Sequence, residues 1–132
     1  MYRRFISTRK DMPHERLQEF AVIDYRKEMY LMATHFEFER EMILGLGQYW
    51  IDENTHTAEI AFVVLDNYHR KGIGEELLTY LTLLAKKQGL LGFTAEVLVE
   101  NIPMQNLFKK AGFDITKRVN DNLYELKMLF RD

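Results

Sequence analysis

The chain has 132 residues, of which 47% are hydrophobic and 29% are charged. That length suits one domain with its own buried core, so we expect a single domain over residues 1–132. Lysine and arginine together number 18 and aspartate and glutamate 20, which gives a formal charge of −2. This balance excludes the concentrated basic face that nucleic-acid binding usually requires, and we expect no nucleic-acid partner.

The sequence contains no cysteine, which excludes a disulfide framework, a thiolate nucleophile and a metal site with cysteine ligands. The four histidines lie far apart and show none of the short spacings typical of metal ligands, so we expect no metal. No hydrophobic run approaches the roughly 20 residues of a membrane helix, and no signal-peptide core is visible. We therefore expect a soluble, cytoplasmic protein with no membrane partner.

The first half of the chain predicts strands and one helix. Asp11 can cap a helix and Pro13 fits its first turn, and a narrow apolar stripe follows. Farther along, two β-rich segments separated by a short acidic stretch predict a hairpin, which a polar turn follows. The expected elements are a strand at residues 2–7, the helix with its stripe Leu17, Phe20 and Ala21, hairpin strands at residues 28–35 and 41–51, and the turn at residues 52–55.

The second half begins with six hydrophobic residues in a row, at positions 60–65. They are too few for a core helix and rich in β-branched types, so they predict a central strand covered on both faces. Apolar residues then recur at helical spacing from Ile73 to Ala85, and Gly89 supplies the stop. The remaining expected elements are a strand at residues 93–99, a helix opened by Asn101 and Pro103 and ended by Gly112, and strands at residues 113–119 and 123–129. This order predicts an α/β or α+β fold with a mixed sheet.

The segment at residues 68–75 leaves the central strand and enters the amphipathic helix. Gly72 and Gly74 let a ligand approach the backbone closely, and the first N–H groups of a helix have no partner within it. Together with the positive end of the helix dipole, these donors predict a phosphate or pyrophosphate site, and Arg70 and Lys71 add charge at its mouth. The alternative is an ordinary strand-to-helix turn whose glycines serve only its geometry.

Two common phosphate-binding motifs do not fit this segment. A P-loop needs a lysine after its second glycine, whereas Lys71 precedes Gly72, and a dinucleotide fingerprint needs a third glycine where Leu77 stands. The pattern that remains, Gln/Arg-x-x-Gly-x-Gly/Ala, resembles the coenzyme A pyrophosphate loop of GNAT-family N-acyltransferases. His69 stands where that family usually has Gln or Arg, which weakens one side-chain contact and leaves the backbone amides intact.

The resemblance to the GNAT family extends over roughly residues 5–129. Residues 58–65 resemble the fourth strand of the family, and residues 96–113 are similar to its fifth strand and fourth helix. Residues 23–29 resemble a sequence typical of GNAT domains in bacterial protein-lysine acetyltransferases. The resemblance implies a mixed, mostly antiparallel sheet of six to seven strands, splayed between strands 4 and 5 and flanked by helices.

In this family the pantetheine of the coenzyme lies in the gap between the splayed strands. The resemblance implies that the backbone of Phe62, Val63 and Val64 binds it, with one N–H polarising the thioester carbonyl, while the side chains pack in the core. The residues that it implies for coenzyme binding are Phe62, Val63, Val64, Arg70, Lys71, Gly72, Ile73, Gly74, Glu75, Asn101 and Phe108.

Two of these residues have competing interpretations. Asn101 matches an Asn that commonly reaches the coenzyme, and it also suits a helix cap that needs no ligand. Phe108 falls where many members carry the Tyr that protonates the leaving thiolate, and Phe cannot donate a proton. Water or Tyr124 would then serve as the acid.

The amine acceptor requires a base, because a lysine amine has a reference pKa of about 10.4 and is mostly protonated near neutrality. Glu59 matches the glutamate that serves as base in the lysine-acetylating branch of the family, and we expect Phe62, Tyr25 or Tyr49 to bury it partly. The alternative is a strand-end glutamate in solvent. Glu96 and Glu100 are weaker candidates for the base. Asp24 and Tyr25 are candidates for shaping the acceptor pocket; the alternative is that Asp24 only caps and Tyr25 only packs.

The resemblance implies an acyl-CoA-dependent N-acyltransferase that moves an acetyl group from acetyl-CoA to a primary amine. The acceptor is a protein lysine or a small amine, attacked directly in a ternary complex with Glu59 as base, since a chain without cysteine cannot form a Cys-acyl intermediate. A non-catalytic domain of the same fold that binds or senses acyl-CoA is the alternative. Members of the family are often dimers, so a homodimer is a further expectation that the sequence leaves open.

Overall fold

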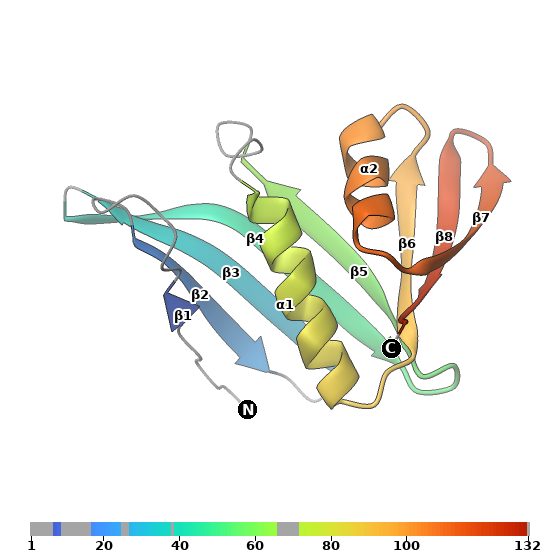
Figure 1. The fold of residues 1–132 in the computed structure, drawn as a ribbon, viewed down its shortest axis with the longest axis horizontal. Coiled ribbons are helices and arrows are strands. Elements are labelled where there is room, and N and C mark those ends of the chain that lie inside the picture. The colour runs from blue at the N-terminus through green and yellow to red at the C-terminus, as the bar shows by residue number, and fades with distance from the viewer. Residues whose placement is uncertain (1–6, 9–16, 25–26, 38, 66–71, 132) are drawn as a thin grey trace.

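The computed structural model describes residues 7–8, 17–24, 27–37, 39–65 and 72–131 of the chain. Figure 1 shows their arrangement as a twisted sheet with two helices. In chain order the elements are β1 (Ser7–Thr8), β2 (Leu17–Asp24), β3 (Glu28–Glu37), β4 (Arg40–Asp52), β5 (Thr57–Val64), α1 (Ile73–Lys87), β6 (Gly92–Leu98), α2 (Ile102–Lys110), β7 (Asp114–Asn120) and β8 (Leu123–Leu129).

The strands of the described residues form one sheet in the order β1-β2-β3-β4-β5-β6-β8-β7. Every neighbouring pair is antiparallel except β5 and β6, which are parallel. The expected mixed, mostly antiparallel sheet is therefore confirmed. The sheet has eight strands, more than the six to seven expected, because residues 17–24, for which a helix was predicted, form β2.

The prediction of a helix with the stripe Leu17, Phe20 and Ala21 is wrong. These residues belong to β2, which pairs along its whole length with β3, so that Phe20 lies opposite Ala33 and Ala21 opposite Met32. Three apolar positions give a weak helical signal, and an eight-residue ladder to a neighbouring strand outweighs it. The predicted capping residues of that helix, at positions 11–16, lie outside the described residues, as does most of the strand expected at residues 2–7.

The parallel pair β5 and β6 is short and then opens. Its register is limited to three residue pairs, Thr57 with Gly92, Ala58 with Phe93 and Glu59 with Thr94. Beyond Glu59 the two strands run on without pairing, and Figure 1 shows them diverging toward their carboxyl ends. The expected splay between the family's fourth and fifth strands is therefore present, here between β5 and β6, and it begins at Glu59.

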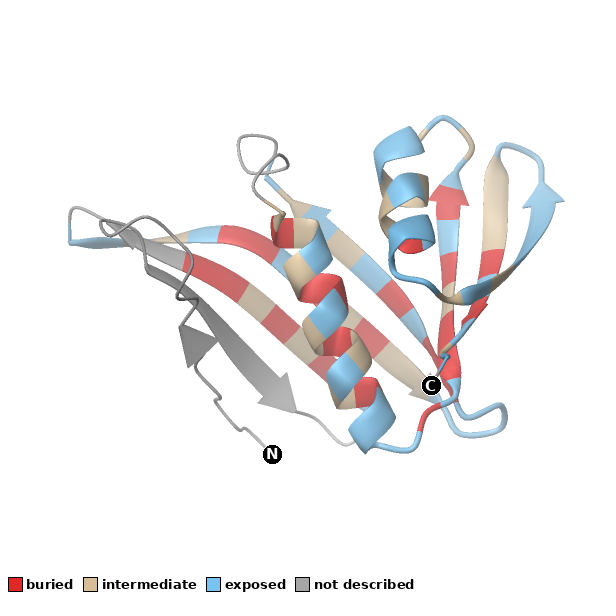
Figure 2. Cartoon of the chain, in the orientation of Figure 1, coloured by how far each residue is buried: buried red, intermediate tan, exposed pale blue. Residues whose placement is uncertain are grey.

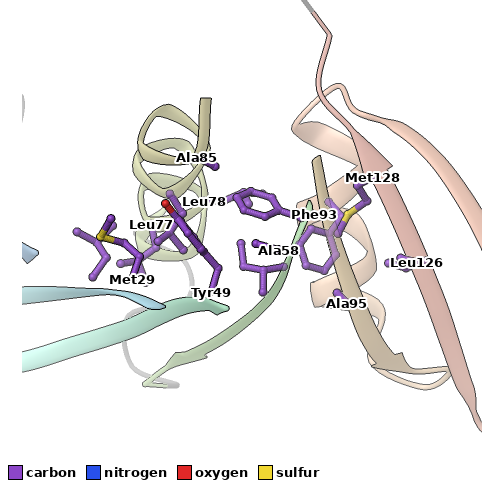
Figure 3. Close-up of a cluster of buried hydrophobic side chains, with 14 of the residues drawn as sticks. Met29, Tyr49, Ala58, Leu77, Leu78, Ala85, Phe93, Ala95, Leu126 and Met128 are labelled. Atoms are coloured by element: carbon purple, nitrogen blue, oxygen red, sulfur yellow. The ribbon is translucent and has the colours of Figure 1, made fainter. Parts of the chain in front are cut away.

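Both helices lie on the same face of the sheet (Figure 1). The buried side of α1 packs over β3, β4 and β5, and Gly45 and Gly47 of β4 leave room for Leu77 and Leu81. Figure 3 shows Ala58 and Phe93 between the leucines of α1 and the side chains of β8. The core contains Met29, Leu31, Tyr49, Ala58, Ile60, Ile73, Leu77, Leu78, Leu81, Ala85, Phe93, Phe108 and Met128.

The expectation that the central strand is covered on both faces is wrong. Along β5 buried and exposed residues alternate, with Ala58 and Ile60 under α1 and Glu59, Ala61 and Val63 exposed (Figure 2). Val63 is 64% exposed. The reason is that both described helices cover one face of the sheet, so the six-residue hydrophobic run contributes to both a buried and an exposed surface. We call the side of the sheet that carries Glu59, Ala61 and Val63 the open face.

Candidate functional site

A cavity of about 520 Å³ lies between the carboxyl end of β5, the start of α1 and one side of α2. It occupies the gap that the divergence of β5 and β6 opens, and Val63 of the open face lines it together with residues of the helix-covered face. We call it the interhelix pocket. Its lining residues are Phe62, Val63, Val64, Gly72, Gly74, Glu75, Asn101, Pro103, Met104, Asn106, Leu107 and Lys110.

The interhelix pocket gathers residues that the sequence placed in a coenzyme site. The predicted residues that line it are Phe62, Val63, Val64, Gly72, Gly74, Glu75 and Asn101. Ile73 instead points into the core with no exposed surface, and Phe108 lies in the core with 2% of its surface exposed. Arg70 and Lys71 are outside the described residues.

The start of α1 borders the pocket with backbone donors. Gly72 is the N-cap residue with a φ of 75°, and its carbonyl accepts the N–H of Glu76 at 3.0 Å. A positive φ at this position suits glycine, and it turns the chain directly from the loop into the helix. The N–H groups at the next positions have no acceptor within the helix, and the positive end of the helix dipole lies there. This end of the pocket therefore suits an anionic group such as a phosphate.

The middle of the pocket is narrow and apolar. A Cβ on Gly74 would lie 3.4 Å from Leu107 of α2 and 3.7 Å from Val64 of β5. The lack of a side chain at Gly74 thus keeps space open where α1, α2 and β5 come together. A ligand with a charged head and a slender, mostly apolar arm fits these walls.

Asn101 has both of the roles that the sequence left open. Its side-chain oxygen accepts the N–H of Met104 at 3.2 Å, which caps α2, and the residue also lines the pocket. The cap uses the side-chain oxygen, so the amide nitrogen is the group that remains suited to a ligand acceptor.

The sequence analysis missed the side of α2 that faces the pocket. Pro103, Asn106, Leu107 and Lys110 follow the i, i+3, i+4, i+7 spacing of one helix face. The apolar stripe of the same helix predicts only the side that packs in the core, where Phe108 lies. Asn106 and Lys110 were the available signal, because two polar residues one turn apart beside an apolar stripe indicate a face open to solvent or ligand. Among the described lining residues, Lys110 is the single cation.

Glu59 lies on the open face, at the point where the parallel pairing ends. It pairs with Trp50 of β4 and Thr94 of β6, and Thr94 in turn pairs with Lys127 of β8. Two grooves of about 420 and 360 Å³ meet here, and Glu59, Thr94 and Lys127 line both of them.

The expected partial burial of Glu59 by Phe62 or Tyr49 is wrong. Glu59 is exposed, whereas Tyr49 is fully buried and Phe62 faces α2, both on the other side of the sheet. The reason is strand alternation: neighbours along β5 point to opposite faces, and Tyr49 pairs with Ile60. Tyr25 lies outside the described residues.

The other candidate residues are distributed unevenly. Glu96 lines the 420 Å³ groove together with Glu59, whereas Glu100 follows β6 and lines none of these cavities. Asp24 ends β2, three strands away from β5 in the sheet, so the structure does not bring it to Glu59. Tyr124 lies on β8 with the Lys117 amine 4.3 Å from its ring centre, and it does not line the interhelix pocket.

Neither a metal-ligand cluster nor a membrane-spanning helix is present among the described residues. No group of three or more histidines, aspartates and glutamates stands close enough to hold a metal ion. No described helix is long and apolar enough to cross a membrane.

Comparison with known proteins identifies the family. Residues 2–113 match the profile of the family described as "Acetyltransferase (GNAT) family". The chain belongs to the GNAT acetyltransferase family. Within it, the chain is 32% identical over 114 residues to the acetyltransferase Pat of Mycolicibacterium smegmatis, an alignment that covers 85% of this chain and 33% of Pat. The chain therefore spans about a third of the length of this curated relative.

Solved structures of GNAT proteins share the fold. The GNAT domain of S. lividans PAT superimposes with a TM-score of 0.69 at 24% identity, covering 82% of this chain and 65% of that one. The PaiA N-acetyltransferase of Thermoplasma acidophilum, solved in complex with coenzyme A, gives a TM-score of 0.66 at 21% identity, covering 79% and 62%. At these identities the similarity shows the fold alone, so the ligand and the reaction have to be argued from this chain's own residues.

Proposed function

We propose that this GNAT domain transfers an acetyl group from acetyl-CoA to a primary amine. The observation that carries the proposal is the interhelix pocket, in which a helix N-terminus lies at one end of an apolar gap between two splayed strands. Coenzyme A has the matching parts, since a pyrophosphate suits the start of α1 and a long, slender pantetheine arm suits the gap. The family relationship and the coenzyme A complex of the PaiA protein support this assignment.

The pantetheine arm would lie along the unpaired end of β5. Beyond Glu59 this strand has lost its parallel neighbour, so the backbone of residues 60–62 on that side is open to a ligand. An arm with amide groups would take the place of the missing strand, and the N–H of Phe62, which points away from β4, would donate to the thioester carbonyl. Such a donor stabilises the negative charge that develops on the carbonyl oxygen during attack.

The acceptor amine would approach from the open face. Glu59 lies there, at the apex of the splay, while the interhelix pocket is lined mainly from the helix-covered face and reaches the open face at Val63. The amine nitrogen attacks the thioester carbon, a C–N bond forms, the C–S bond breaks, and the amine proton passes to the Glu59 carboxylate. The coenzyme leaves as a thiolate that takes a proton from water, because Phe108 has no proton to give.

The open face is consistent with a lysine presented by another protein. Glu59 is exposed and lines both grooves of this face, so an acceptor side chain can reach it from solvent. A small amine is the competing acceptor. The similarity to Pat supports an acetyltransferase and leaves the acceptor to experiment.

A second candidate function is a non-catalytic domain that binds acyl-CoA. Two observations favour it: Phe108 stands where an acid would help the thiolate to leave, and Glu59 is exposed rather than enclosed. Such a domain would bind acetyl-CoA and acetylate no amine.

The test compares Glu59→Gln with Glu96→Gln, a matched control on the same groove of the open face. Both exposed variants should fold and should bind acetyl-CoA like the wild type in calorimetry, because neither residue lines the interhelix pocket. With a lysine peptide or spermidine as acceptor, Glu59→Gln should lower kcat by about 100-fold or more, and Glu96→Gln by less than about threefold. Equal rates for the two variants would refute the assignment of Glu59 as the base. If the wild type binds acetyl-CoA but acetylates no acceptor, the non-catalytic binding domain would be favoured.

A further inference from the structure

We infer that Phe62 and Phe108 form an inner wall that restricts this domain to short, neutral acyl groups. The inference rests on the proposed function, because it assumes that the interhelix pocket holds an acyl-CoA. It goes further by naming the class of acyl group and the residues that select it.

The lining residues give the pocket a direction. The end that suits the phosphates lies at Gly72 and Gly74, at the start of α1. Gly74 is close to Val64 and Leu107. Phe62 lies two residues farther along β5 on the same side of the strand, about 7 Å deeper toward the apex of the splay. A ligand that binds its phosphates at α1 therefore extends toward Phe62.

The ring of Phe62 is backed by a second ring. The ring centres of Phe62 and Phe108 are 6.0 Å apart, and the rings are tilted by 43°. Phe108 is the buried residue of α2, with 2% of its surface exposed, so it is locked in place by the core behind it. The Phe62 ring faces the pocket, and the Phe108 ring behind it blocks its movement away from a ligand. The two rings therefore form a rigid boundary.

The acyl group is the part of the ligand that meets this boundary. If the N–H of Phe62 holds the thioester carbonyl, the acyl chain begins beside the Phe62 side chain. An acetyl group ends before it reaches the ring of Phe62. Each methylene added to a longer acyl chain would have to displace that ring, which is already packed against Phe108.

The wall also selects against charge. Both of its side chains are aromatic hydrocarbons, and the neighbouring lining residues Met104 and Leu107 are apolar as well. A carboxylated acyl group such as succinyl would bring a charge against the hydrocarbon rings of Phe62 and Phe108, which offer it no hydrogen bond, and this contact is unfavourable. The acyl class is therefore acetyl, with propionyl at the limit.

The experiment measures the dissociation constants of coenzyme A, acetyl-CoA, butyryl-CoA and succinyl-CoA by calorimetry. For the wild type, we expect butyryl-CoA and succinyl-CoA to bind at least tenfold more weakly than acetyl-CoA. Phe108→Ala should bring butyryl-CoA to within about threefold of acetyl-CoA and leave succinyl-CoA weak. Phe108→Leu should give an intermediate ratio and protects the test against a variant that does not fold.

Phe113→Leu is the matched control, since Phe113 packs against Phe93 and Phe130 and does not line the pocket. It should leave all ratios unchanged. Equal binding of acetyl-CoA and butyryl-CoA by the wild type would overturn the inner wall while leaving the proposed function intact. Failure of the wild type to bind any of the four ligands would refute the proposed function, and this inference with it.

Discussion

The role of the α1 N-terminus is tested by comparing Gly72→Ala with Gly89→Ala. The two glycines flank α1, and both have a positive φ, of 75° and 79°. A Cβ at either position would meet no atom within 4 Å, so neither variant creates a clash. What remains is the cost of placing an alanine in the left-handed region, roughly 1–2 kcal/mol at each site. Both variants should therefore lose about the same stability, which corresponds to a fall in Tm of about 4 °C or somewhat more.

The two variants should differ in coenzyme binding. Gly72 lines the interhelix pocket, whereas Gly89 is exposed beyond the other end of the helix. A small backbone rotation at position 72, which relieves only part of this strain, would turn the first amides of α1 away from the phosphates. Hydrogen bonds to a charged group contribute about 1.5–3 kcal/mol each, so losing one weakens binding by roughly 10- to 150-fold.

The assay is thermal unfolding of each variant without ligand, followed by calorimetric titration with acetyl-CoA. We expect matched Tm values, a weakened dissociation constant for Gly72→Ala and an unchanged one for Gly89→Ala. If Gly72→Ala binds acetyl-CoA as tightly as Gly89→Ala, the start of α1 is not the phosphate site and its glycine serves only the turn.

Further predictions concern single residues of the pocket and the core. Lys110→Ala should weaken coenzyme A binding about five- to tenfold in calorimetry, whereas Lys109→Ala, its neighbour outside the pocket, should not, and the loss should shrink with 3′-dephospho-CoA if Lys110 contacts the 3′-phosphate. Gly47→Ala should lower the free energy of unfolding by about 1–3 kcal/mol in urea titrations, because the new Cβ would lie 2.8 Å from Leu81; an unchanged midpoint would show that the core adjusts freely. Asn101→Ala should cost about 1 kcal/mol through the lost cap, and a loss of coenzyme affinity beyond that of a stability-matched variant would show the ligand contact as well.

Local signals in the sequence predicted the second half of the fold well. Asn101 caps α2 and Pro103 lies in its first turn, and Gly89 and Gly112 follow the two helices with φ of 79°. Each of these signals acts within one turn of the chain, so it can be read without the rest of the molecule.

The errors arose where distant segments decide the structure. Whether residues 17–24 form a helix or a strand depends on pairing with β3, which outweighs a short apolar stripe. Whether one or both faces of the central strand are covered depends on which face of the sheet the helices pack against. The uninterrupted hydrophobic run at residues 60–65 does not indicate which face that is.

The part of the candidate site that lies within one continuous sequence motif was predicted. The strand, the turn and the start of α1 follow one another in the sequence, and the structure brings Val64, Gly72 and Gly74 to one pocket. Lys110 was missed because it joins the pocket only after α2 folds back over the gap. The exposure of Glu59 was missed because burial depends on neighbouring strands rather than on residues nearby in the chain.

The central claim is that the interhelix pocket binds acyl-CoA through the start of α1. The most direct measurement is calorimetric titration of the wild-type chain with acetyl-CoA, repeated with ATP, which carries phosphates on an adenosine without a pantetheine arm. We predict saturable binding of acetyl-CoA at one site, with ATP at least tenfold weaker because it leaves the gap between β5 and β6 empty. No binding of acetyl-CoA up to millimolar concentration, or equal binding of ATP, would contradict the claim.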